Sequence, residues 1–99
     1  MKYIEAKRCF VRDDGSKTYL TYLQGKLFRQ LLEEQGEVVT WNKMSTEIYD
    51  DEEDFLYRQN IKELRKKIIA KTGVVIKTII GLGYVLETPV EFEREVKEG

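Results

Sequence analysis

The first twenty residues contain three short stretches that favour β-strands, at 3–6, 8–12 and 17–20. Between the last two, residues 13–16 read Asp-Asp-Gly-Ser, and Asp and Gly tolerate the backbone angles that tight hairpin turns need. We therefore expect the fold to begin with a small antiparallel sheet.

The hydrophobic period changes at Thr21 from that of a strand to that of a helix. Thr21 and Gln24 form a capping-box pattern, and Gly36 marks the expected helix end. The apolar positions that share one face of this helix are Leu27, Phe28, Leu31 and Leu32.

Two further helices are predicted downstream. Thr40 is the expected N-cap of the second, in which Met44 and Ile48 lie four residues apart and Tyr49 closes the helix. The third is expected over about 54–71, with acidic residues near its start and lysines near its end, as suits the helix dipole. Its buried stripe is Tyr57, Ile61, Leu64 and Ile68.

A β-hairpin is predicted to follow Gly73. Residues 74–80 are mostly β-branched, 81–83 (Gly-Leu-Gly) supply the turn, and 84–86 form the returning strand. The chain thus has α+β character, with a small antiparallel sheet, three helices and a C-terminal hairpin. We expect one domain over 1–88 and an acidic tail over 89–99, with Pro89 at the boundary. The sequence allows three states for the tail: disorder, an added strand, or a segment for self-association.

The net charge of −1 conceals two opposed segments. Residues 55–86 carry seven basic residues against Glu63 alone, whereas 50–54 are all acidic and 87–99 are net acidic. This basic segment covers the third helix and the hairpin, so a polyanionic partner is compatible with the chain despite its net charge.

Composition excludes several classes of function. The chain has no His, which removes the usual general base and the commonest metal ligand, and its single Cys9 permits no internal disulfide. We expect Cys9 to fill apolar space in a strand, and we expect no cofactor, no bound metal and no enzyme activity. No stretch is long and apolar enough to span a bilayer, so a cytoplasmic location without membrane contact is expected.

A helical wheel of the third helix places a polar face opposite the buried stripe. Gln59, Lys62, Glu63 and Lys66 lie on this face, with Arg58 and Arg65 at its margins. Such a face suits the major groove of DNA, which offers hydrogen-bond acceptors between two rows of phosphates. The alternative is an ordinary solvated helix surface.

These residues and their spacing resemble the C-terminal DNA-binding domains of OmpR/PhoB-type response regulators. The resemblance covers about 20–86, from Leu20 and Thr21 at the first helix, through Gly36, Val38, Val39 and Thr40 at the next turn, to Met44, Ile48 and Tyr49. It continues through Asn60, Ile61, Leu64, Arg65, Lys66, Lys67 and Ile68 in the third helix, and Ile76, Lys77, Thr78, Ile79, Gly81, Gly83, Tyr84, Val85 and Leu86 in the hairpin.

The resemblance implies a winged helix-turn-helix fold and a role for particular residues. Base edges would be met by Gln59, Lys62 and Glu63, and phosphates by Arg65 and Lys66. Further backbone contacts are implied for Tyr49, Lys77 and Thr78. In the family the loop that corresponds to 50–54 can contact RNA polymerase, and two copies can pair side by side on DNA; the alternative for this acidic loop is a solvated loop whose charge caps the third helix.

Three positions depart from the family pattern. Ile80 stands where many members carry arginine, Glu63 stands where a basic residue is common, and Gly25 replaces a usually large residue in the first helix. Gly25 is therefore expected to cost helix propensity and packing. No receiver domain is present in this sequence, so we expect a standalone regulator that is controlled by its abundance or by a partner.

Two functions follow from the sequence. The first is a sequence-specific, double-stranded DNA-binding transcriptional regulator, with one helix in the major groove and the hairpin on the backbone. The second is a winged-helix adaptor that binds a protein such as RNA polymerase, which Glu63, Ile80 and the acidic segments favour.

Overall fold

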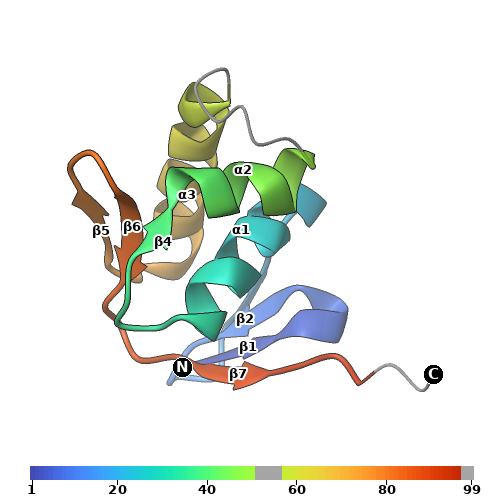
Figure 1. Cartoon of the computed structure of the whole chain (residues 1–99). Coiled ribbons are helices and arrows are strands. Elements are labelled where there is room, and N and C mark those ends of the chain that lie inside the picture. Colours follow the sequence, from blue (N-terminus) through green and yellow to red (C-terminus); the bar gives the residue numbers. More distant parts are fainter. Residues whose placement is uncertain (51–56, 97–99) are drawn as a thin grey trace.

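The computed structural model describes residues 1–50 and 57–96, and its N-terminal part is a small sheet (Figure 1). Strands β1 (Lys2–Ile4) and β2 (Cys9–Val11) are antiparallel, and a 3-10 turn, η1 (Glu5–Lys7), connects them. β2 pairs with β3 (Lys17–Tyr19) through the predicted turn, where Gly15 adopts a φ of 85°. The three strands form as expected, each slightly shorter than predicted.

The chain after Pro89 adds a fourth strand to this sheet. β7 (Glu91–Glu93) pairs in parallel with β1, which gives the order β3-β2-β1-β7. The sheet is therefore mixed rather than antiparallel, and it continues past the expected boundary at residue 88. Gln35 fixes this segment, because its side-chain amide donates to the Val90 carbonyl at 2.6 Å and accepts from the Val90 N–H at 3.0 Å.

Helix α1 (Tyr22–Glu33) begins with the predicted capping box. The Thr21 hydroxyl accepts from the Gln24 N–H at 3.3 Å, and the Gln24 side chain accepts from the Thr21 N–H at 3.1 Å. The helix ends at Glu33, earlier than predicted. Gly36, with a φ of 81°, lies in the following turn, and its N–H donates to Leu86 at 3.1 Å instead of to a helix carbonyl.

Helix α2 (Trp41–Tyr49) follows the short strand β4 (Val39–Thr40). The Thr40 hydroxyl accepts a hydrogen bond from the Lys43 N–H at 3.3 Å, which confirms Thr40 as the N-cap. Met44 and Ile48 are buried, as their four-residue spacing predicts.

Helix α3 spans Arg58–Thr72, with Tyr57 as its N-cap. Ile61 and Ile68 are fully buried, and the other two positions of the predicted stripe, Tyr57 and Leu64, pack against the core. The helix begins later than predicted, and its first turn contains no acidic residue. The expected start at Asp54 and positions 51–54 of the acidic loop lie outside the described residues.

The hairpin consists of β5 (Ile76–Ile79) and β6 (Gly83–Leu86), and β4 completes a three-stranded sheet in the order β4-β6-β5. Gly83 is required here, because a Cβ at this position would lie 1.9 Å from the Val39 carbonyl oxygen. Ile80, expected within the first strand of the hairpin, instead lies in the turn with 94% of its surface exposed.

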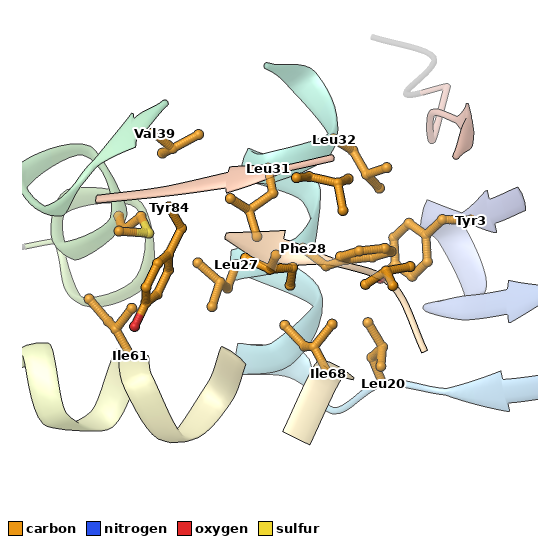
Figure 2. Close-up of a cluster of buried hydrophobic side chains, with 14 of the residues drawn as sticks. Tyr3, Leu20, Leu27, Phe28, Leu31, Leu32, Val39, Ile61, Ile68 and Tyr84 are labelled. Carbon is orange, nitrogen blue, oxygen red and sulfur yellow. The ribbon is translucent and has the colours of Figure 1, made fainter. Parts of the chain in front are cut away.

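A single core joins the three helices to both sheets (Figure 2). Tyr3 and Phe28 meet edge to face with ring centroids 5.0 Å apart, and Trp41 meets Tyr84 in the same way at 4.9 Å. Cys9 is buried, in agreement with its predicted role as an apolar filler. None of the helices in the described part of the chain has the length and apolarity needed to cross a membrane.

Candidate nucleic-acid interface

The polar face of α3 is open to solvent along its length. Gln59, Lys62, Glu63 and Lys66 are all exposed, as the helical wheel predicts. They project away from the side of the helix that carries the buried Ile61 and Ile68. The face thus presents an amide, two ammonium groups and one carboxylate.

The carboxylate on this face has a partner on the same helix. Glu63 Oε1 lies 3.5 Å from Lys66 Nζ, and both side chains are more than half exposed. An exposed pair of this kind contributes little to stability, because water and salt screen it. Its main effect is to reduce the positive charge that the face offers to a polyanion.

Arg65 is engaged within the protein. Its Nε and Nη2 donate to the Ile76 carbonyl at 3.0 and 2.6 Å, and its guanidinium lies 5.2 Å from the centre of the Tyr84 ring. Burial raises the pKa of Tyr84, and the nearby Arg65 charge acts in the opposite direction. The structure therefore connects Arg65 to the hairpin, whereas the resemblance implied a phosphate contact.

Arg58 and Tyr49 lie at the end of α3 that is nearest to α2. The Arg58 guanidinium lies 5.2 Å from the centre of the Trp41 ring. Tyr49 stacks on Tyr57 with ring centroids 4.2 Å apart and an interplanar angle of 14°. Both candidate residues are half-buried, so aromatic contacts hold them at the start of the exposed face.

The hairpin lies beside α3 and adds a second polar surface (Figure 1). Lys77 and Thr78 on β5 are exposed, and Lys77 Nζ lies 3.5 Å from Glu87 Oε1. The turn itself is apolar, since Ile80 is 94% exposed and Leu82 is 54% exposed.

A network at the C-terminal end of α3 was not predicted. Lys71 Nζ donates to Gln24 Oε1 at 2.9 Å and to the Tyr19 carbonyl at 3.2 Å, and the Arg12 guanidinium donates to the Lys71 carbonyl. The same Gln24 oxygen completes the α1 capping box, and Gln24 is buried. A glutamine at this position signals a cap in the sequence, but the contact with Lys71 joins residues 47 positions apart.

Of the acidic loop expected at 50–54, only Asp50 is described. It ends α2 in the left-handed conformation with a φ of 54°, and its N–H donates to the Thr46 carbonyl at 2.9 Å. Within residues 1–50 and 57–96, no group of three or more Cys, Asp or Glu side chains is arranged to hold a metal ion.

Gly25 does not loosen the packing of the first helix, although its departure from the family pattern predicted that it would. A Cβ at this position would lie 3.0 Å from both Tyr3 Oη and Arg8 Cδ. The missing side chain therefore allows Tyr3 and Arg8 to approach the α1 backbone closely.

Known structures share this arrangement. The chain is similar to the DNA-binding domain of Bacillus subtilis CssR, with a TM-score of 0.66 and 18% identity over 86% of this chain and 97% of that chain. For the DNA-binding domain of E. coli CadC the TM-score is 0.65 and the identity is 22%, over 86% of this chain and 83% of that chain. For the C-terminal domain of the nisin resistance regulator NsrR the TM-score is 0.59 and the identity is 22%, over 83% of this chain and 94% of that chain. These likenesses show the fold.

Sequence comparison gives a relative and a family. The chain is 27% identical over 93 residues to the sensory transduction protein BceR of Bacillus subtilis (strain 168), which covers 90% of this chain but 40% of that protein. The family described as "Transcriptional regulatory protein, C terminal" matches residues 15–86, which is most of the chain. The chain therefore belongs to this family, that of the OmpR/PhoB-type winged-helix DNA-binding domains of transcriptional regulators.

Proposed function

We propose that this protein regulates transcription by binding a specific double-stranded DNA sequence, with α3 in the major groove and the hairpin on the adjacent backbone. The observation that carries this proposal is the exposed face of α3, on which Gln59, Lys62 and Lys66 lie beside the exposed Lys77 and Thr78 of the hairpin. Membership of a family of non-enzymatic DNA-binding domains agrees with the expectation that the chain is not an enzyme.

The exposed side chains of α3 match the chemistry of base edges. A glutamine amide pairs with adenine, a lysine donates to the acceptors of guanine, and a carboxylate accepts from cytosine. We assign Gln59, Lys62 and Glu63 to base contacts and Lys66 to phosphate. Because Glu63 also repels phosphate, it favours sequences that place a cytosine amino group within reach of its carboxylate oxygens.

The hairpin supplies backbone contacts in this proposal. Lys77 attracts phosphate as an exposed ammonium group, and the Thr78 hydroxyl donates to a phosphate oxygen. Arg65 contributes mainly by joining the hairpin to α3, with any phosphate contact secondary. Tyr49 and Arg58 are assigned to the backbone at the other end of the helix.

The remaining assignments concern assembly. We propose that two copies bind side by side on repeated half-sites, and that residues 1–88 carry the DNA-binding function while 89–99 contribute a strand and acidic charge. A contact between loop 50–54 and RNA polymerase is part of the same proposal. The activities of longer relatives such as BceR extend to this chain only as proposals, because the chain spans 40% of that protein.

A titration of a labelled mixed-sequence duplex at two salt concentrations tests DNA binding directly. Neutralising phosphates releases counterions, so the logarithm of the affinity is expected to fall linearly with the logarithm of the salt concentration. Absence of binding even at low salt would contradict the proposal and would favour the adaptor that binds a protein. Selection of bound duplexes from a random pool then gives the half-site and its spacing.

A further inference from the structure

A surface cavity lies on the N-terminal side of α1, among β1, η1 and the first turns of the helix. Its volume is about 340 Å³, which is within the range of small-molecule sites. The residues that line it are Tyr3, Glu5, Ala6, Arg8, Tyr22, Gly25, Lys26, Arg29 and Glu95. None of them belongs to the proposed DNA interface.

The wall of the cavity contains a buried phenol. Tyr3 is only 1% exposed, and within residues 1–50 and 57–96 its hydroxyl has no hydrogen-bond partner. The hydroxyl oxygen itself keeps contact with the cavity, so it is a donor that an acceptor placed there can reach. Burial raises the pKa of Tyr3 to about 12 from its ordinary 10.0, and at neutral pH the hydroxyl is protonated at either value.

Gly25 leaves room for the Tyr3 hydroxyl and the Arg8 side chain against α1. It faces Tyr3 Oη and Arg8 Cδ, each 3.0 Å from the position that a Cβ would occupy. Its backbone angles are those of an ordinary helix, so α1 does not require a glycine for its geometry. The departure from the family pattern at this position therefore lets the Tyr3 hydroxyl and the Arg8 side chain lie against the α1 backbone at the cavity.

The charges around the cavity favour an anion. Arg29 is already compensated, since its Nε lies 2.5 Å from Glu5 Oε2. Arg8 uses Nε to donate to the Leu20 carbonyl at 3.2 Å, and in the described part of the chain it has no carboxylate partner.

The remaining cation at the cavity is Lys26, and it has no ion pair among the described residues either. Its Nζ donates to the Glu47 carbonyl at 3.4 Å and lies 4.9 Å from the centre of the Tyr22 ring. The exposed Glu95 opposes these two cations at the rim, and its N–H donates to Glu5 at 2.7 Å.

We propose that this cavity binds a small aromatic carboxylate. The carboxylate accepts hydrogen bonds from the Tyr3 hydroxyl and the free end of the Arg8 guanidinium, with Lys26 adding attraction. The aromatic ring lies against Tyr22, a residue that is 60% exposed at the rim. This site is separate from the DNA interface, and its occupation does not depend on DNA binding.

Titration of the whole chain with benzoate, followed by two-dimensional amide NMR, tests the proposal. Saturable shifts at Gly25 and Arg8 are expected for benzoate, whereas benzamide, which has the same shape without the charge, is expected to bind much more weakly. Inorganic phosphate distinguishes a requirement for a carboxylate from one for any anion. Shifts that do not saturate, or equal binding of benzamide, would overturn the proposal.

Two variants locate the ligand. Tyr3→Phe removes only the hydroxyl and is expected to weaken benzoate binding about tenfold or more, as loss of a hydrogen bond to a charged acceptor does. Tyr19→Phe, at an exposed tyrosine outside the cavity, is the matched control and is expected to bind as the parent does. Gly25→Ala places a methyl group in the site and is expected to reduce binding as well. Equal affinity of the Tyr3→Phe and Tyr19→Phe variants would show that the phenol is not the donor.

Discussion

Arg65 of α3 donates two hydrogen bonds to the single carbonyl of Ile76 on β5, at 3.0 and 2.6 Å. This fork joins the helix that presents the candidate base-contacting residues to the hairpin that presents the candidate phosphate-contacting residues. The distance between the two elements of the proposed DNA interface thus depends on an interaction that is internal to the protein.

Replacing Arg65 with Met is expected to lower the free energy of unfolding by about 1–3 kcal/mol, because the variant loses two charge-assisted hydrogen bonds and the contact with Tyr84. Urea denaturation measures this change. Lys67→Met, at an exposed position of the same helix, is the control and is expected to change stability little. If the Arg65 variant kept full stability and lost only salt-dependent DNA affinity, phosphate binding would be its main role.

Substitutions on the exposed face of α3 separate base contacts from phosphate contacts. Gln59→Ala and Lys62→Ala are each expected to cost about 1–3 kcal/mol on the preferred site and to relax its sequence preference. Lys66→Ala is expected to weaken binding to all sequences and to reduce the salt slope by about one. Lys7→Ala, an exposed lysine on η1, controls for the loss of charge. Equal losses for the Lys7 and Lys62 variants would contradict the assignment of α3 to the groove.

Ile80 provides a test by gain of charge. Because its side chain is 94% exposed, Ile80→Arg is expected to leave stability nearly unchanged. If the hairpin approaches DNA, the added cation raises affinity and increases the salt slope by about one, whereas the neutral Ile80→Gln does not. An unchanged slope in the arginine variant would place the turn away from phosphate.

The attachment of β7 depends on Gln35. Gln35→Ala leaves the N–H and carbonyl of the buried Val90 without their side-chain partner and is expected to cost about 1–3 kcal/mol of stability. Chemical denaturation measures the loss, and Gln59→Ala, at an exposed glutamine, is the control. Hydrogen exchange of the β7 amides is expected to accelerate in the Gln35 variant only.

The raised pKa of Tyr3 predicts how the free energy of unfolding changes at alkaline pH. Its pKa is raised from 10.0 to about 12 in the folded state, so the unfolded chain loses this proton at a lower pH. Stability from this group is therefore complete below pH 10 and is lost as the pH rises through 12. Urea denaturation at several pH values between these limits is expected to show a steeper decline for the parent than for Tyr3→Phe. Parallel declines would mean that the phenol ionises equally in both states.

Most secondary structure followed from local rules. The Thr21 and Thr40 caps, the buried stripe with Ile61 and Ile68, and the turn at Gly15 depend on neighbouring residues, so sequence spacing was sufficient to predict them. The predicted ends of helices and strands were less accurate where a backbone group bonds to a distant residue instead of to a neighbour in its own element. Gly36 is an example, because its N–H bonds to Leu86 fifty residues away.

The sequence by itself determined the fold class, the order of the first three strands, the three helices and the hairpin, and the set of side chains on the open face of α3, because these depend on helical and strand periodicity. Only the tertiary structure decided that Arg65 bonds to the hairpin, that Lys71 meets Gln24, that the last strand is parallel to the first, and that Tyr3 and Arg8 pack against Gly25 of α1. Each of these contacts joins residues far apart in the chain. Their partners are selected by the packing of the whole core, which no local spacing encodes.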